Sequence, residues 1–350
     1  MHRSVLPLFL LLAAAASAQS TDVFTVLLGE GNVAAIRPGP SGSTYVLGSS
    51  ASAELPTKSA FQPELAPGDC DGRLSSELPC PDLFLAKLDP NGELLFLTYL
   101  GGAGREIGID LAVDSGGVAY VLGKTESETE PESGSVGPAG LSDGPFLAQV
   151  SADGQALLGA VALPGEPTAL ALDGNRPIVV GITQYDDVPV IGATPAPISD
   201  SAFFAPGPEG SPVVRNAGLS GPIVDIQVIG SRLFVLANDV FVSSDGGESW
   251  TASGQASVVD HWVLESDTTR VIAAAPDDPL TVYAAAQGKL LRTRSAGASW
   301  TDVTPTLDQA SDRPLAVAAG SGGRLYTGSF SGTYRSDDYG ETWTHDDQRG

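Results

Sequence analysis

The sequence predicts an all-β protein, a β-propeller of about six to seven four-stranded blades. Three observations lead to this prediction. The 350 residues are punctuated by 42 glycines and 26 prolines, long amphipathic segments are hard to find between these turn signals, and one hairpin pattern recurs along the chain. Regular repetition of a short unit favours a propeller over a pair of stacked β-sandwiches, which is the competing architecture.

The recurring pattern is a short apolar strand, a polar turn that usually contains glycine, and a second apolar strand. It is found at 34–50, 109–125, 168–183, 224–239, 271–289 and 315–332. One hairpin cannot bury its apolar face alone, whereas repeated units packed against one another can. At about 40–50 residues per blade the chain has room for seven blades. We expect the seventh to combine the strand at 22–28 with C-terminal strands.

The first 18 residues have the layout of a secretory signal peptide. His2 and Arg3 precede an apolar run at 5–16, and small residues precede Gln19. The run is too short to cross the roughly 30 Å of a bilayer core. We therefore expect cleavage after Ala18 and an exported protein of bacterial type that is secreted, periplasmic or at the cell surface, without membrane insertion.

The chain is strongly acidic, with a formal net charge of −24 and an isoelectric point near 4.2. Phosphate groups would be repelled from such a surface, which argues against nucleic-acid partners. The charge is compatible with solubility alone or with a cationic partner. The oligomeric state stays open.

The two cysteines, Cys70 and Cys80, are predicted to form a disulfide that pins an inserted loop. Closing a loop of this length contributes roughly 2.7 kcal/mol in the loop-entropy interpretation. Two thiols without a nearby histidine are too few for a structural zinc site.

Residues 82–125 resemble the bacterial β-propeller repeat called SBBP. The resemblance depends on Asp-x-Phe-x-Ala-Lys-Leu at 82–88, Tyr-Leu-Gly-Gly at 99–102 and Gly-x-x-Tyr-Val-x-Gly at 117–123. It implies that this stretch forms nearly a whole blade. A weaker copy begins at 144, where Gln149 replaces the lysine. We assign 19–203 to SBBP-like blades.

Three phrases in the second half resemble the Asp-box, or BNR repeat, of sialidases, sortilin-like receptors and photosystem assembly propellers. They lie at 243–250, 293–300 and 336–343. The matching residues are Ser243, Asp245, Gly247 and Trp250 in the first box, Gly297 and Trp300 in the second, and Ser336, Asp338, Gly340 and Trp343 in the third. The resemblance implies box-type blades over 204–350.

Each box is expected to staple a tight turn between two strands of a blade. The aspartate accepts backbone N–H bonds, glycine supplies a positive φ, and tryptophan buries an apolar body beneath the turn. In the middle box Ser295 replaces the aspartate and can still bond the backbone, although more weakly. The resemblance places the boxes at the blade periphery, away from the central funnel where ligands bind.

The boxes also raise the possibility of a sialidase, which needs three arginines, a Tyr nucleophile assisted by Glu, and an acid/base Asp. The Arg-Ile-Pro signature of that family is missing, since the nearest string is Ile-Arg-Pro at 36–38. Side chains of the required types are Arg37, Arg105, Arg215, Arg270, Arg292, Tyr99, Tyr283 and Tyr326. Nothing in the sequence selects among them, so the catalytic positions stay unknown.

Other chemistries have less support. No Gly-x-Ser-x-Gly elbow occurs, and the mature chain has only His261 and His345. The segments at 68–73 and 243–247 lack the full twelve-residue calcium pattern, so we expect neither a metal nor a cofactor.

We therefore predict an exported, non-catalytic scaffold that binds a protein or glycan. The alternatives are a sialidase-like glycoside hydrolase acting in the funnel, or a fragment of a longer surface protein. The second alternative arises because the third box ends seven residues before the last residue, which leaves little chain for the final blade edge.

Overall fold

The structure is a computed structural model. It describes residues 9–13, 23–68, 70, 79–126, 143–182, 202–206, 212–214, 219, 223–237, 239–253, 272–286, 289–306, 314, 316–329 and 332–346. The chain divides into two compact units, Met1–Arg176 and Pro177–Gly350. Over the described residues the regular structure is β-strand, apart from the single-turn 3-10 helices η1 (Pro40–Gly42) and η5 (Ser321–Gly323). The all-β prediction is confirmed.

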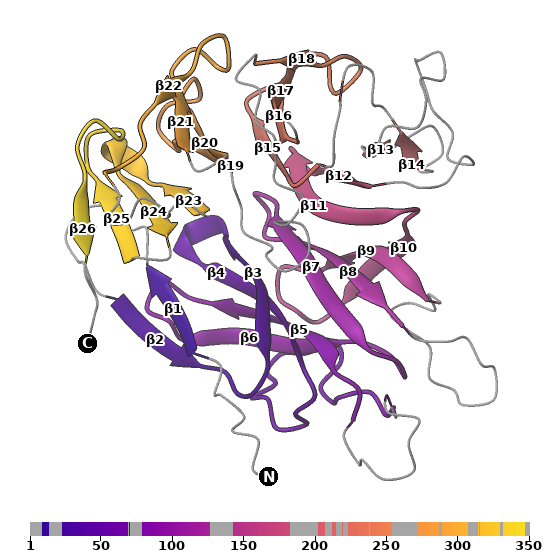
Figure 1. Ribbon diagram of the computed structural model, residues 1–350. Helices are drawn as coiled ribbons and strands as arrows, with labels where there is room; N and C mark the ends of the chain where they lie inside the picture. Colours follow the sequence, from indigo (N-terminus) through magenta and orange to yellow (C-terminus); the bar gives the residue numbers. More distant parts are fainter. Residues whose placement is uncertain are drawn as a thin grey trace. The chain divides into compact units, whose positions relative to one another are not determined.

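Six four-stranded antiparallel sheets are formed by the described residues, each from four strands that are consecutive in the chain (Figure 1). The first contains β3 (Asn32–Pro38), β4 (Thr44–Ser50), β5 (Asp82–Leu88) and β6 (Leu94–Leu100). The second contains β7 (Glu106–Val113), β8 (Ala119–Thr125), β9 (Gly144–Val150) and β10 (Leu157–Ala162). The third contains β11 (Glu166–Asp173), β12 (Arg176–Ile182), β13 (Ala202–Pro206) and β14 (Pro212–Val214).

The remaining three sheets lie in the second unit. The fourth contains β15 (Asp225–Ile229), β16 (Arg232–Leu236), β17 (Val240–Ser243) and β18 (Thr251–Ala252). The fifth contains β19 (Ile272–Ala274), β20 (Val282–Ala286), β21 (Lys289–Thr293) and β22 (Thr301–Asp302). The sixth contains β23 (Ala316–Ala319), β24 (Leu325–Ser329), β25 (Gly332–Ser336) and β26 (Thr344–Asp346).

These sheets are the blades of a β-propeller, as predicted. Within the first unit the leading strand of each sheet lies beside that of the next, β3 beside β7 and β7 beside β11. Within the second unit β15 lies beside β19, and β19 beside β23. The six hairpins expected from the sequence are the first and second strands of the six sheets, so that prediction is confirmed strand by strand.

The SBBP-like stretch does not form one blade. Residues 82–125 supply β5 and β6 of the first sheet and β7 and β8 of the second. The expectation that this stretch forms nearly a whole blade is therefore wrong, because it supplies the last two strands of one blade and the first two of the next. A repeat read from a sequence can start anywhere in its period, whereas the blade is defined by hydrogen-bonded neighbours.

The seventh blade that we expected from 22–28 and C-terminal strands is not formed by the described residues. Instead β2 (Val23–Leu27) pairs antiparallel with β1 (Phe9–Ala13), with Phe9 opposite Leu27. The third box is followed by β26, which completes the sixth sheet. The expectation of a missing edge there is also wrong. The signal peptide, which would contain β1, stays a prediction.

The core of the first unit follows the alternation of its strands. Tyr45 and Leu47 on β4 pack with Leu111, Val121 and Phe146 of the second sheet, whereas the intervening Val46 packs on the opposite face. Side chains of a strand point alternately to its two faces, so both faces of this sheet are buried. Each fully buried large apolar side chain contributes about 1.5–3 kcal/mol.

Two tyrosines join consecutive blades of the first unit. The Tyr45 hydroxyl donates to the carbonyl oxygen of Gly117 at 2.8 Å, and the Tyr120 hydroxyl donates to that of Asn175 at 2.9 Å. Burial, and secondarily the nearby Asp114 carboxylate, raises the pKa of Tyr45 to about 12. The tyrosine of the repeat pattern is therefore a neutral donor aimed at the hairpin turn of the following blade.

In the second unit a continuous core runs through the fourth, fifth and sixth sheets. Phe234, Val282, Leu290 and Leu325 are buried in one cluster. None of the described helices has the length and hydrophobicity that crossing a bilayer requires.

Candidate functional site

The boxes form the turns between the third and fourth strands of the blades in the second unit. In the third box, Asp338 accepts a bond from the backbone N–H of Thr342 at 2.8 Å and another from its hydroxyl at 2.6 Å. The Ser336 hydroxyl donates to Asp338 and accepts from the N–H of Gly340, which has φ of 90°. These bonds, led by that of the Thr342 hydroxyl, lower the pKa of Asp338 to about 2.

The first box has the same geometry. Asp245 accepts from the backbone and hydroxyl of Ser249, and Ser243 accepts from the N–H of Gly247 at 2.9 Å. The Ser249 hydroxyl is the main cause of the lowered pKa of Asp245. Trp250 is buried.

The middle box keeps the turn without its carboxylate, as the sequence suggested. The Ser295 hydroxyl oxygen accepts from the N–H of Ser299 at 2.9 Å, and Thr293 takes the place of the first serine by accepting from Gly297 at 2.9 Å. Trp300 packs against the core of the second unit.

The third box also fastens the sixth sheet to the fifth. Arg292 on β21 donates to the carbonyl oxygen of Tyr339 and to the Glu341 carboxylate, both at 2.8 Å. The indole N–H of Trp343 donates to the carbonyl oxygen of Val303 at 2.9 Å. A box turn is therefore also a contact between neighbouring blades.

A pocket of about 370 Å³ lies beside this contact. Its lining comes from β22 and the loop after it, from β25, from the third box and from β26, and consists of Thr301, Asp302, Val303, Thr304, Thr306, Tyr334, Gly340, Glu341, Trp343 and His345. Outer strands of two blades thus form it, rather than the leading strands that would surround a funnel. Three box residues, Gly340, Glu341 and Trp343, line the pocket, which the resemblance did not imply.

Three aromatic side chains belong to a pocket lining that is otherwise mostly polar. Tyr334 and His345 are directly opposite each other on β25 and β26, and their rings stack with centroids 4.4 Å apart and planes 12° apart. Trp343 contributes a third ring system. Such surfaces suit ligands that combine apolar faces with polar groups.

The polar groups of the lining differ in how far the fold already uses them. Thr304 is fully engaged, because its hydroxyl donates to Asp302 at 2.6 Å and accepts from the N–H of Leu290 at 2.9 Å. The exposed Thr301 and Thr306 hydroxyls make no hydrogen bond to the described part of the chain. They are available to a ligand.

Among the described residues of the lining, both carboxylates are paired with cations. Asp302 lies 3.3 Å from the Lys289 ammonium. Glu341 pairs with Arg292 at 2.8 Å and, at 3.8 Å, with Arg294. The pocket rim therefore carries little uncompensated charge.

Several of the side chains considered for a sialidase are engaged within their own unit, and Tyr283 and Arg292 are paired on neighbouring strands. Arg37 pairs with Asp110 in the first unit, and Arg292 holds the third box. Arg215 and Arg270 lie outside the described residues. Tyr99 and Tyr283 are fully buried, and burial raises the pKa of both, to about 12 for Tyr283. A nucleophilic tyrosine needs the opposite shift.

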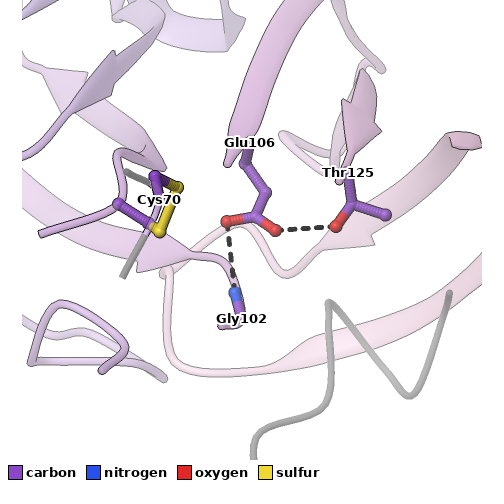
Figure 2. Close-up of a disulfide and its surroundings, with 5 residues drawn as sticks. Cys70, Gly102, Glu106 and Thr125 are labelled. Carbon is purple, nitrogen blue, oxygen red and sulfur yellow. Dashed lines mark hydrogen bonds between the residues drawn. A yellow bond between two sulfur atoms is a disulfide. The ribbon is translucent and has the colours of Figure 1, made fainter. Parts of the chain in front are cut away.

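The predicted disulfide between Cys70 and Cys80 is present, with Cα atoms 5.1 Å apart, and it lies near the buried Glu106 carboxyl group (Figure 2). Glu106 forms a buried carboxyl pair with Asp82. Glu106 accepts from the Thr125 hydroxyl at 2.7 Å and from the N–H of Gly102 at 3.2 Å. Asp82 accepts from the N–H of Ala66 and the amide of Gln62, each at 2.9 Å.

This carboxyl pair explains part of the SBBP-like pattern. A side chain at Gly101 would approach the Asp82 carboxyl carbon to 2.2 Å, so glycine is required there. Both carboxyl groups are fully buried, so a substrate has no access to them. The described residues contain no group of three or more His, Cys, Asp or Glu arranged to hold a metal. Of the two calcium-like segments, 68–73 lies largely outside the described residues, and Asp245 in the other is engaged within its box.

Sequence reasoning named Gly340, Trp343 and His345 but missed the rest of the pocket. The sequence feature that could have pointed to the pocket is the set of threonines at 301, 304 and 306, directly after the middle box. Its meaning depends on β25 and β26 of the next blade, about 30 to 40 residues later, which no local pattern identifies.

Comparisons with known proteins give fold-level likeness only. No family model matches the chain. No curated protein matches it either. Among solved structures, YCF48 from Cyanidioschyzon merolae has 14% identity and a TM-score of 0.49, covering 90% of this chain and 85% of that one. Apo AztD from Citrobacter koseri has 13% identity and a TM-score of 0.45, covering 92% and 87%. A Lactobacillus plantarum protein has 16% identity and a TM-score of 0.42, covering 77% and 76%.

Proposed function

We propose that this protein is an exported, non-catalytic β-propeller that binds a protein or glycan ligand in the pocket between its fifth and sixth sheets. In this proposal the chain is cleaved after Ala18, the blades within 19–203 are of the SBBP-like kind, and those within 204–350 are of the Asp-box kind. The third box builds part of the wall of the binding site in addition to stapling its blade.

The observation that carries the proposal is the composition of the pocket. Its volume of about 370 Å³ is within the range of small-ligand sites, about 300–1,000 Å³. The Thr301 and Thr306 hydroxyls are not used by the described part of the fold, and aromatic rings lie beside them. The lining is mostly polar, and polar groups that converge on a concave site fix the orientation of a ligand.

The same lining supports binding rather than sialoside hydrolysis. It contains Tyr334, Glu341 and Asp302, but none of its described residues is an arginine that could hold a substrate carboxylate. Arg292, the nearest candidate, donates instead to Glu341 and to the carbonyl oxygen of Tyr339. The described residues of the lining therefore do not provide electrostatic stabilisation of an anionic substrate.

The test blocks the pocket without touching the staples. Thr301 is exposed and follows the middle-box tryptophan, and Thr251 is exposed and follows the first-box tryptophan, so Thr301→Arg and Thr251→Arg are a matched pair. The full-length protein and both variants are applied to arrays of immobilised peptides and glycans. We expect a ligand that binds the wild type and Thr251→Arg, with at least tenfold weaker binding to Thr301→Arg.

Two outcomes would overturn the proposal. One is no binding by folded wild-type protein on either array. The other is a ligand whose binding is unaffected by both Thr301→Arg and Thr306→Arg. Turnover of a bound glycoside that the pocket variants abolish would show that the protein is an enzyme.

A further inference from the structure

We infer that the pocket takes a neutral saccharide unit, rather than an acidic sugar or a cationic peptide side chain. This inference rests on the proposed function, because it names the ligand class of the same pocket. It follows from three properties of the lining, namely its charge balance, its unused hydroxyls and its aromatic surface.

The charge balance separates neutral from charged ligands. Asp302 and Glu341 have half-exposed side chains at the pocket, and each already has a cationic partner, Lys289 or Arg292. A cationic ligand would have to compete with these partners. An anionic ligand would meet two carboxylates, and the part of the lining that the structure describes holds no arginine or lysine. A neutral ligand encounters neither penalty, since it brings no charge to desolvate.

The hydroxyls and carboxylates suit a polyhydroxylated ligand. The Thr301 and Thr306 hydroxyls can donate or accept, and the Asp302 and Glu341 oxygens accept. A sugar hydroxyl also does both, so it can satisfy each of these groups. Carboxylates held by cations are good acceptors for neutral hydroxyl donors, because a charge-assisted hydrogen bond is stronger than a neutral one.

The aromatic rings suit the remaining surface of a sugar. A pyranose ring has C–H groups on its faces and hydroxyls at its edge, and it gains by burying the C–H faces against an apolar surface. Trp343 and His345 are partly exposed and provide that surface beside the hydroxyls, with the His345 ring stacked on the buried Tyr334. The pocket volume of about 370 Å³ limits the bound part to a small ligand unit.

The experiment measures binding of defined probes to full-length protein by calorimetry and ligand-observed NMR. The probes are four neutral disaccharides (lactose, maltose, cellobiose and diacetylchitobiose), 3′-sialyllactose as an anionic sugar, and a tetralysine peptide. We expect at least one neutral disaccharide to bind with an affinity that changes less than twofold between 20 and 500 mM NaCl, because screening does not affect a neutral ligand. Thr301→Val is expected to weaken that binding about fivefold, and Thr251→Val to leave it unchanged.

The outcomes distinguish the two proposals. Binding of tetralysine or 3′-sialyllactose with strong salt dependence, without any neutral disaccharide binding, would overturn the saccharide assignment and leave the pocket as the binding site. Binding of a neutral disaccharide that neither Thr301→Val nor Thr301→Arg weakens would overturn both, since the sugar would then bind elsewhere. Absence of binding by all probes would overturn the saccharide assignment, and the peptide and glycan arrays would then decide the proposed function.

Discussion

The Asp225 carboxylate connects two blades by accepting a hydrogen bond from the backbone N–H of Ile272 at 2.9 Å. Its other oxygen accepts from the N–H of Ile226 at 2.7 Å. Asp110 makes the same pair of contacts in the first unit, to Leu170 at 2.9 Å and Leu111 at 2.8 Å. In both units a leading strand is thus joined to the next leading strand in the same way.

Removing this carboxylate is expected to destabilise the protein. Asp225 is buried, so Asp225→Ala leaves two buried N–H donors without that acceptor and lowers the free energy of unfolding by about 2–3 kcal/mol. The matched control is Asp277→Ala, which removes an exposed carboxylate that accepts from the N–H of Gly322 at 2.6 Å. Water replaces that acceptor, so the loss there is expected to be below about 1 kcal/mol. Urea unfolding followed by circular dichroism measures both, and equal losses would contradict the role assigned to burial.

The tyrosine contact between blades gives a second prediction. Tyr45→Phe keeps the buried ring and removes the donor to Gly117, so the free energy of unfolding is expected to fall by about 1–2 kcal/mol. Tyr326→Phe, at a partly exposed position on β24, is the control and should change little. Thermal unfolding measures the stability of both variants. If Tyr45→Phe is as stable as the wild type, the packing of the ring alone holds the two blades together.

The parts of the fold that could be predicted are those whose physics is local. Glycine at the positive-φ position of a box, such as Gly340, and alternating apolar strands such as β4 depend on neighbours a few residues away. The phase of the blades could not be predicted, because it depends on which strands pair. The pocket could not be predicted either, because Thr301 and Tyr334 meet only when two blades pack.

The middle box offers a stabilising substitution. In the other two boxes the aspartate accepts hydrogen bonds from the backbone N–H and the hydroxyl of the residue four positions later. In the middle box the neutral Ser295 hydroxyl accepts from the backbone N–H of Ser299. Ser295→Asp should add a charge-assisted bond and raise the free energy of unfolding by about 0.5–1 kcal/mol. Ser295→Asn, which offers a neutral acceptor, should gain less. Differential scanning calorimetry measures both, and a lower melting temperature for Ser295→Asp would refute the assigned role of the box carboxylate.

The buried carboxyl pair predicts a pH dependence. Burial, ahead of the nearby Glu106 carboxylate, raises the pKa of Asp82 to about 8. Tyr99 is the other titratable side chain facing Asp82, and burial raises its pKa as well. The folded protein thus holds a proton on Asp82 at pH values where the unfolded chain, with an ordinary aspartate pKa near 3.9, has released it.

The sign of the effect follows from this difference in bound protons. The stability that Asp82 contributes is fully present below about pH 4 and is lost progressively as the pH rises towards 8, at up to about 1.4 kcal/mol per pH unit. Asp82→Asn keeps the shape and the neutral state, so its unfolding free energy should lack this decline and exceed that of the wild type at pH 9. Urea unfolding at pH 5, 7 and 9 measures the slope, with Asp153→Asn as an exposed control that keeps the wild-type slope above pH 5. Parallel slopes for Asp82→Asn and the wild type would show that Asp82 is ionised in the folded protein and that its carboxylate is stabilised by Gln62 and the N–H of Ala66 instead.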